Sequence, residues 1–338
     1  MKKNTTPSVT FIIPTLNSAP TLRESLESIS RLDYPKSKIH AIIVDGGSSD
    51  TTLAIARSFP FCHIKHVRTS GPEIATAIGY NMATSTYCVN FPSDNVILDR
   101  QWLRCMIAPL EEDKTIIASE PWRYAYVKND TLLNRYFALF GVNDPLAYYL
   151  KKRDRTTYFE QSLAFAPTPE LRAGYWCVDF TKDSLPTVGA NGFIVRTKII
   201  QRVTQEPTRF SHIDSCVDLL NLGHTRYAFV KTDIWHKTGE SMSGYFARRS
   251  RYAKTLYFEK QHMRRYHLFD PSRDRRALLR YILYSLTMIE PLLQAARGAW
   301  YVRDVAWFLH PYICMRLTLQ YAYITTRHML HNRRKNQL

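Results

Sequence analysis

The stretch SVTFIIPTLN, residues 8–17, decides the fold of this chain. Its residues 9–14 are apolar or β-branched in an unbroken run, which is typical of a strand that is buried on both faces of a sheet. Pro14 and the polar residues after it end the run, so we expect the strand to open into a loop at its carboxyl end. The pattern indicates a buried strand of a parallel sheet.

Helix and strand patterns alternate after this first strand. Leu22, Leu26 and Ile29 recur at helical spacing, and Thr21 stands where an N-cap is expected. Further strands are predicted at 39–44, 63–67 and 87–91, and further helices at 52–58 and 73–83. This alternation predicts an α/β fold with a mostly parallel sheet flanked by helices, whose ligand crevice lies beyond the carboxyl ends of the strands.

The polar loops that follow the strands carry the candidate chemistry. Asp94 comes directly after the fourth predicted strand. Its carboxylate would therefore face the crevice, where it could hold a hard cation such as Mg or Mn through oxygen. An aspartate between Ser93 and Asn95 is also a common turn former. The residues alone leave both roles open.

Three segments, taken in order, resemble the nucleotide-binding half of the inverting glycosyltransferase family 2. They are IIPTLN (12–17), IIVDGGSSD (42–50) and FPSDNVIL (91–98). The resemblance implies the A-type glycosyltransferase fold, which is Rossmann-like, and a nucleotide-sugar donor held with Mn or Mg. It places the base and ribose on four residues, and the rest of the donor and the metal on two more. The first set is Pro14, Thr15, Asn17 and Asp45, and the second is Ser93 and Asp94.

The chain departs from the family pattern at two places. The family's metal motif has two aspartates separated by one residue, and Pro92 stands in place of the first of them. Thr76 and Ala77 stand where the family often carries Arg and Asn. Asn95, next to Asp94, offers a further oxygen. The phosphates would then rely more on the metal and on basic residues elsewhere in the chain.

Two later features also follow the family's order. GANGF, residues 189–193 within the strand-like piece 188–196, resembles the acceptor-side loop, which implies that Asn191 and Gly192 contact the acceptor. A strand is predicted at 227–234, and the resemblance makes the histidine after it, His236, a metal ligand near the pyrophosphate. A lone histidine is otherwise more often structural.

The segment FSHIDSCVDLL, residues 210–220, occupies the place of the family's catalytic acidic segment. Asp214 is the candidate general base, because it precedes a helical run that would put its carboxylate at a helix start beside the crevice. Asp218 is the rival candidate, with a purely structural acid as its other role.

Positive charge gathers in the last quarter of the chain. From residue 246 onward there are 18 Lys or Arg against five Asp or Glu, within a formal net charge of +17 for the whole chain. The cluster of Arg248, Arg249 and Arg251 would clamp a pyrophosphate or meet lipid phosphate, or would form a solvated helix face. Nucleic acid is a poorer partner, because the chain has no zinc spacing, helix-turn-helix or aromatic RNA-binding pattern. The absence of GxxxxGK[ST] argues against a phosphoryl transferase.

The apolar stretches at 281–296 and 305–324 are interrupted by charges before they reach the roughly 20 residues that span a bilayer. They predict amphipathic helices in the membrane interface, with Trp300, Trp307 and Tyr281 at headgroup level. The alternative is a helical subdomain packed on the core.

The short polar start of the chain offers no signal peptide, and its six cysteines form no C-x-x-C pair. We interpret them as buried thiols of a protein in a reducing compartment. We therefore expect a peripheral or monotopic protein on the cytoplasmic face of the cell membrane.

Together these features predict a metal-dependent inverting hexosyltransferase. It would move a sugar from a nucleotide-sugar, preferably a UDP-sugar, to a hydroxyl of a lipid-linked glycan such as a polyprenyl-linked one. Residues 1–100 would bind the donor, 101–245 would form the acceptor-binding and catalytic half of the same domain, and 246–338 would associate with the membrane. The alternative is a catalytically weak or inactive nucleotide-sugar or lipid-binding scaffold of the same fold, because Pro92 removes a usual acid.

Overall fold

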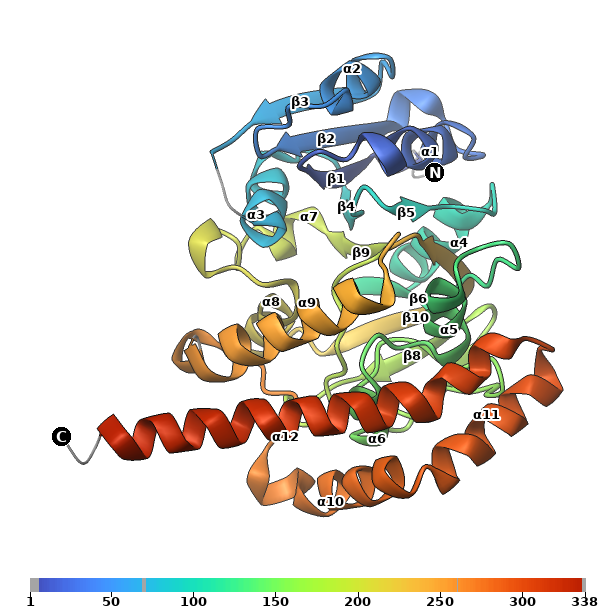
Figure 1. Cartoon of the computed structure of the whole chain (residues 1–338). Helices are drawn as coiled ribbons and strands as arrows, with labels where there is room; N and C mark the ends of the chain where they lie inside the picture. The colour runs from blue at the N-terminus through green and yellow to red at the C-terminus, as the bar shows by residue number, and fades with distance from the viewer. Residues whose placement is uncertain (1–5, 69–70, 260, 336–338) are drawn as a thin grey trace. The chain divides into compact units, whose positions relative to one another are not determined.

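Figure 1 shows the computed structural model of the chain, which describes residues 6–68, 71–259 and 261–335. The side chains of residues 256, 257 and 331–335 lie outside the description. The chain forms two units. Unit 1 consists of Met1–Ala125 and Leu163–Lys237, and unit 2 of Tyr126–Ser162 and Thr238–Leu338.

Unit 1 is built on one mixed sheet with the strand order β3-β2-β1-β4-β9-β6-β10-β8-β7, and β5 pairs with β10. The four strands from β3 to β4 are parallel, β9 is antiparallel to both of its neighbours, and β10 is parallel to β6. The strands are β1 (Val9–Thr15), β2 (Ile39–Asp45), β3 (Cys62–His66), β4 (Tyr87–Asn90), β5 (Asn95–Val96), β6 (Ala118–Tyr124), β7 (Glu170–Arg172), β8 (Tyr175–Asp179), β9 (Phe193–Arg196) and β10 (Arg226–His236).

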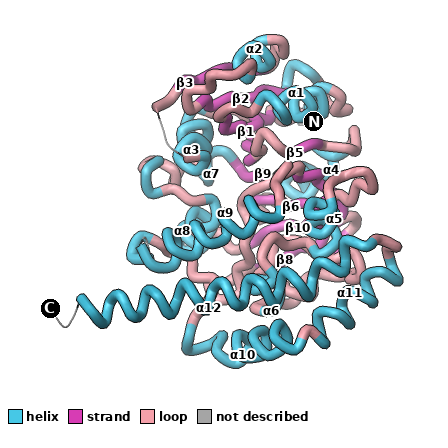
Figure 2. Tube along the Cα trace, viewed as in Figure 1, coloured by secondary structure: helices cyan, strands magenta, loops and turns pink. Residues whose placement is uncertain are grey.

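The first strand confirms the prediction from its sequence, because all seven residues of β1 are buried between β2 and β4. Helices flank the sheet (Figure 2). Helix α3 packs closely on β1, and a side chain at Gly79 would collide with Ile12. The helices of unit 1 are α1 (Ala19–Ser30), α2 (Thr52–Arg57), α3 (Pro72–Met82), α4 (Trp102–Glu112), α7 (Thr197–Ile200) and α8 (His212–Asn221). The predicted α/β class with a mostly parallel sheet is therefore confirmed for this unit.

The structure corrects three details of the prediction. Helix α1 begins at Ala19 rather than after Thr21, because Pro20 suits the first turn, where no backbone N–H is needed. Only the second half of the strand-like piece 188–196 is a strand, and the first half is a loop. Cys105 is exposed, although the cysteines were expected to be buried.

Unit 2 is helical in its described residues, and aromatic rings fill its centre. The ring of His310 stacks on that of Phe140 at 3.7 Å, and its Nδ1 lies 3.0 Å from the hydroxyl of Tyr136. Burial lowers the pKa of His310 to about 3, so this imidazole is neutral. The helices are α5 (Leu132–Phe140), α6 (Pro145–Tyr149), α9 (Met242–Lys254), α10 (Pro271–Thr287), α11 (Ile289–Tyr301) and α12 (Leu309–Lys335). Within the described ranges, none of the helices has both the length and the apolar character needed to cross a bilayer.

Candidate active site

The loops that follow β1 and β2 are held together by one carboxylate. Asp45 ends β2 and is 1% exposed. Its Oδ2 accepts hydrogen bonds from the backbone N–H groups of Gly47 and Ser48, both at 3.0 Å. Its Oδ1 accepts from the hydroxyls of Ser48 at 2.5 Å and Thr15 at 3.2 Å. Burial alone would raise the pKa of Asp45, but these hydrogen bonds outweigh it and lower the pKa.

Asn17 ties the first loop to the second from the other side. Its φ of 51° lies in the left-handed region, which asparagine tolerates better than most residues. Its backbone N–H donates to Ser48 Oγ at 2.9 Å, and its Oδ1 accepts from the N–H of Ser49 at 2.9 Å. Thr15, Asn17 and Asp45, which the sequence placed at the donor site, are therefore brought into one hydrogen-bonded group. Pro14 is buried within β1, where it pairs with Val44 of β2.

The loop after β4 joins this group through Ser93, whose hydroxyl donates to Ser18 Oγ at 3.0 Å. The next residue, Asp94, meets His236 because β5 pairs antiparallel with the end of β10, with Asn95 opposite His236. Asp94 Oδ2 lies 3.3 Å from His236 Nε2. The two predicted metal ligands, 142 positions apart in the sequence, are thus neighbours at the edge of the sheet.

Several polar atoms at this edge have no hydrogen-bond partner among the described residues. They are Asp94 Oδ1 and both amide atoms of Asn95, and all three are buried. The described residues contain no group of three or more His, Cys, Asp or Glu that could hold a metal by itself. A Mg-type ion, however, is usually held by one or two carboxylates together with substrate phosphates. Adjacent ligands of an octahedral ion at ~2.1 Å are about 3 Å apart, so the distance between Asp94 and His236 fits a shared divalent ion.

The predicted acceptor loop is fixed to the end of β4. Gly192 N–H donates to the carbonyl of Asn90 at 2.9 Å, and Asn90 Nδ2 donates to the carbonyl of Gly189 at 2.8 Å. Asn191 and Gly192 have φ values of 52° and 90°. A Cβ at Gly192 would also come within 3.0 Å of the Trp102 ring, so this position requires glycine on both counts.

Tyr124, at the end of β6, links the predicted acceptor loop to the Asp94–His236 pair, and sequence reasoning missed it. Its hydroxyl accepts a hydrogen bond from Asn191 Nδ2 at 3.1 Å. Its ring lies 5.8 Å from the ring of His236, centroid to centroid. The residue is 4% exposed. No local motif marks it, because the pairing of β6 with β10 creates the contact.

Asp214 lies in the first turn of α8 and is 2% exposed, whereas Asp218 is half-buried. Glu73, in the first turn of α3, holds the start of α8. Its carboxylate accepts from His212 N at 2.9 Å and lies 2.6 Å from His212 Nδ1. The predicted helix start at Asp214 is therefore present, and its role as a base stays a prediction. Thr76, which replaces the family's arginine or asparagine, is buried and donates to the carbonyl of Pro72 at 2.8 Å.

The arginine cluster belongs to α9 in unit 2. Arg248 Nε and Nη2 donate to the two carboxylate oxygens of Glu240 at 2.9 and 2.6 Å. Arg249 Nη2 lies 3.2 Å from Asp144 Oδ2, and Arg251 is exposed. The first two guanidinium groups thus form ion pairs within their own unit, and a role of the cluster in donor binding stays a prediction.

Comparison with known proteins agrees with the fold. Residues 10–166 match the family model described as glycosyl transferase family 2. A stretch of 56 residues is 43% identical to glycosyltransferase AglE of Haloferax volcanii, and it covers 17% of this chain and 18% of that protein. The match thus spans less than a fifth of the curated relative.

Among solved structures, the mannosyltransferase PcManGT from Pyrobaculum calidifontis, determined in complex with GDP-Man and Mn2+, has a similar fold. The two chains are 18% identical, the TM-score is 0.53, and the match covers 95% of this chain and 86% of the other. This likeness concerns the fold alone. The chain has the A-type glycosyltransferase fold, and its residues 10–166 match glycosyl transferase family 2.

Proposed function

We propose that this protein is an inverting glycosyltransferase that moves a sugar from a nucleotide-sugar donor to an acceptor hydroxyl. The observation that carries the proposal is the pairing of β5 with β10, which brings Asp94 and His236 within 3.3 Å at the edge of the sheet. The pair stands beside the loop after β1, to which Ser93 is hydrogen-bonded through Ser18. The similar PcManGT was determined with GDP-Man and Mn2+, which supports a sugar nucleotide and a divalent metal as ligands of this edge.

The residues divide the work of donor binding. Asp94 and His236 would hold a Mn or Mg ion, whose chemistry is to neutralise the charge that develops on the departing pyrophosphate. Asp45 keeps the loops after β1 and β2 in place, so that Thr15 and Asn17 meet the base and ribose. Because Asp45 already accepts four hydrogen bonds and is almost fully buried, it acts on the donor mainly through these loops.

Asp214 would act as the general base. It takes the proton from the acceptor hydroxyl as that oxygen bonds to the anomeric carbon, while the bond from this carbon to the nucleotide oxygen breaks. Attack from the side opposite the leaving nucleotide inverts the configuration. Asn191 and Gly192, on the loop tied to β4, would orient the acceptor.

The preferred donor is a UDP-sugar, with GDP-mannose as the next candidate because PcManGT binds it. The proposed acceptor is a lipid-linked glycan, and the proposed location is the cytoplasmic face of the cell membrane. The basic, aromatic C-terminal quarter of the chain supports both.

One observation favours a second function. Pro92 stands where the family carries the first aspartate of its metal motif, which would suit a scaffold that binds a nucleotide-sugar without transferring it. Hydrolysis of the donor separates the two functions, because a scaffold would bind but not cleave it.

A panel of UDP- and GDP-sugars, screened by thermal shift with and without Mn, tests the proposal. A donor at about 100 times its dissociation constant stabilises the protein by roughly 2.7 kcal/mol. The donor found in this way is then incubated with Mn, and the released nucleotide and the anomeric configuration of the product are measured. Transfer with retention would contradict the mechanism, and Mn-dependent binding without any turnover would favour the scaffold.

A further inference from the structure

Helices α10 and α11 of unit 2 bury one face and expose another. Tyr281, Ser285 and Ala295 are at most 1% exposed and face the interior. Besides Tyr301, six large apolar side chains on the two helices are each more than half exposed, and Trp300 is the most exposed at 88%. We call this group the outer face. It consists of Leu279, Leu283, Leu286, Ile289, Leu293 and Trp300.

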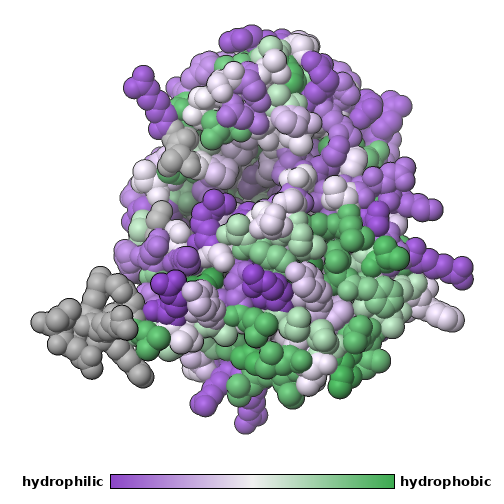
Figure 3. Space-filling model, in the orientation of Figure 1, coloured by the Kyte–Doolittle hydropathy of each residue, from purple (hydrophilic) through white to green (hydrophobic). Residues whose placement is uncertain are grey.

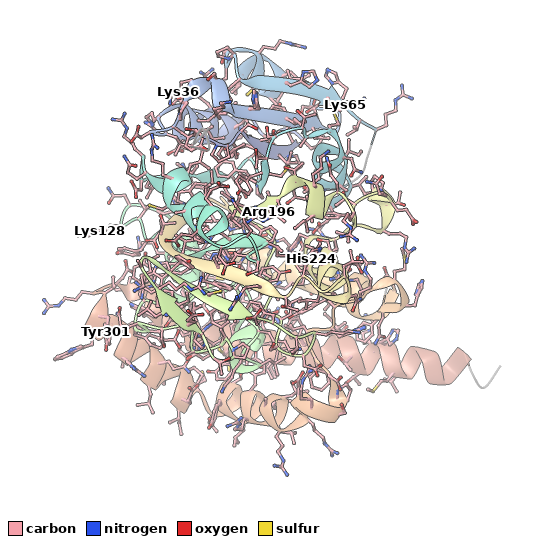
Figure 4. The ribbon with its side chains drawn as sticks, turned by 180° about the vertical axis from the view of Figure 1, so that it is seen from behind. Lys36, Lys65, Lys128, Arg196, His224 and Tyr301 are labelled. Atoms are coloured by element: carbon pink, nitrogen blue, oxygen red, sulfur yellow. The ribbon has the colours of Figure 1, made fainter. Side chains whose placement is uncertain are left out.

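The outer face is continuous rather than a scatter of single residues. Leu279, Leu283 and Leu286 follow the spacing of one helix face on α10, and Ile289, Leu293 and Trp300 do the same on α11. Figure 3 shows the hydrophobic area over these helices, and Figure 4 shows from behind that Tyr301 lies at the outer end of α11. Contiguous exposed apolar patches on a protein surface commonly mark protein or membrane interaction sites.

The acidic side chains of this region are turned inward. Between residues 271 and 330 the chain has three, Asp274, Glu290 and Asp304, and none of them is exposed. Asp274 lies 3.8 Å from Lys152, and Asp304 lies 3.0 Å from Arg135. Glu290 accepts a hydrogen bond from the hydroxyl of Tyr149, and burial raises its pKa.

The basic side chains around the outer face point outward. The exposed arginines on α10, on α11 and directly after α11 are Arg273, Arg275, Arg276, Arg280, Arg297 and Arg303. The surface is therefore apolar along its length, positive at its borders and free of exposed carboxylates between residues 271 and 330. A second copy of the chain fits this surface poorly, because face-to-face pairing would place these arginines opposite one another.

We propose that the outer face of α10 and α11 docks flat on an anionic lipid bilayer. Its leucines and Trp300 enter the zone between headgroups and acyl chains, and Arg276 and Arg280 meet lipid phosphate. This proposal deepens the membrane location proposed above, and it is tested by binding alone, without any use of the donor chemistry. It also narrows the membrane-associating region, predicted from the sequence as residues 246–338, to the two helices α10 and α11.

The structure corrects the anchors expected from the sequence. Trp307 and Tyr281 were expected at headgroup level, yet they are 0% and 1% exposed. Trp307 Nε1 donates to the carbonyl of Val302 at 2.9 Å, so its ring is part of the interior. The inner face of the C-terminal helices is therefore packed within the protein, as the alternative of a helical subdomain predicts. The outer face is the part that we assign to the bilayer.

The test measures binding of the full chain to vesicles of phosphatidylcholine with and without phosphatidylglycerol, by sedimentation at low salt. The double variant Leu283→Asp with Leu293→Asp should lower the partition coefficient by at least about tenfold, since two apolar side chains lose their burial in the bilayer. The matched control, Leu171→Asp with Leu222→Asp, changes two exposed leucines of unit 1 and should bind as the unchanged protein does.

A charge variant, Arg276→Gln with Arg280→Gln, should weaken binding to vesicles that contain phosphatidylglycerol but not to pure phosphatidylcholine. The proposal is overturned if the unchanged protein ignores anionic vesicles, or if the leucine variant and its control bind alike. Self-association that only the leucine variant abolishes, without vesicle binding, would also overturn it and assign the face to a second copy. Donor hydrolysis is measured in parallel, so that a failure of the transferase proposal is recognised separately.

Discussion

At the carboxyl ends of the strands, the polar groups form two neighbouring sets that differ in their hydrogen bonding. In the loops after β1 and β2, the Asp45 carboxylate accepts four hydrogen bonds, and Asn17 is bonded to the facing loop. At the β4–β5–β10 edge, Asp94 Oδ1 and both amide atoms of Asn95 are buried without a partner among the described residues. The polar groups of the first set are paired within the folded chain, and those of the second are the ones that the proposed donor and metal would satisfy.

This difference separates the positions that should affect stability from those that should affect function. A buried polar group without a partner costs about 1–3 kcal/mol, so a fold retains such groups mainly where water, an ion or a ligand satisfies them. Changes at the β4–β5–β10 edge should therefore affect activity more than stability. Changes at Asp45 should affect both.

The largest effect is expected for Asp94→Ala. Turnover with Mn should fall by about a thousandfold or more, which corresponds to ~4 kcal/mol of lost transition-state stabilisation. The melting temperature should hardly change, because one oxygen of the removed carboxylate, Oδ1, forms no hydrogen bond with the described residues of the folded chain. Steady-state kinetics and thermal unfolding measure the two quantities.

Asp99→Ala is the matched control for this variant. Asp99 is an exposed aspartate five positions further on, and its Oδ1 accepts from the N–H of Gln101 at 2.9 Å. It should keep near-normal activity. Near-normal turnover of Asp94→Ala with Mn would remove Asp94 from the metal site.

The next largest effect is expected for Asp214→Asn. Donor binding should persist, while turnover falls by about 100-fold, the usual range for the loss of a general base. Asp218→Asn serves as the control, because it lies one helical turn further along α8 and is half-buried. Full activity of Asp214→Asn together with inactivity of Asp218→Asn would reverse the assignment.

The sequence predicted the sheet and the strand-end loops well, because those features are local. An unbroken apolar run identifies β1, and a polar loop after each strand identifies the edge where Asp45 and Asp94 lie. The strand β8, the antiparallel placement of β9 and the register of β5 against β10 could not be derived in this way. They depend on which distant segments pair, and it is this pairing that places His236 next to Asp94.

The sequence also could not predict which side chains of the C-terminal helices point inward. Helical spacing identifies the apolar residues of the C-terminal helices, but it does not show which of these residues pack on the protein. Trp300 and Trp307 have similar surroundings in the sequence, yet one is 88% exposed and the other 0%. Tertiary packing decides between them.

Asp45→Asn should affect both stability and donor binding, which would sharpen the comparison. The amide nitrogen cannot accept the hydrogen bonds that one carboxylate oxygen now receives, so unfolding should become easier by about 1–3 kcal/mol. Donor affinity should fall by about tenfold as the loops loosen, which corresponds to ~1.4 kcal/mol. Denaturant unfolding and donor titration check the two effects.

The stability difference should depend on pH. The pKa of Asp45 in the folded chain is lowered from the ordinary value of 3.8, so the charged carboxylate stabilises the fold above pH 3.8. This contribution is lost as the pH falls through the lowered pKa. The unchanged protein and Asp45→Asn should therefore differ most near neutral pH and converge in acid. An equal difference at both ends of the pH range would show that Asp45 is not stabilised as a carboxylate.

The smallest effect is expected for Tyr124→Phe, at the boundary between the acceptor loop and the metal-ligand pair. The change removes the hydrogen bond from Asn191 Nδ2 but keeps the ring beside His236. One such bond contributes about 0.5–1.5 kcal/mol, so the KM for the acceptor should rise by roughly threefold. The KM for the donor and the dependence on Mn should stay unchanged, because the packing on His236 is retained.

Tyr124→Leu removes the ring as well and separates the two contacts. If Tyr124 positions both neighbours, the leucine variant should also require more Mn for half-maximal activity, whereas the phenylalanine variant should not. Equal Mn requirements in all three proteins, with unchanged acceptor KM, would mean that Tyr124 only fills the core. A shift in Mn requirement alone would assign it to the His236 side of the edge, where the aromatic ring packs beside the imidazole that lies 3.3 Å from Asp94 Oδ2.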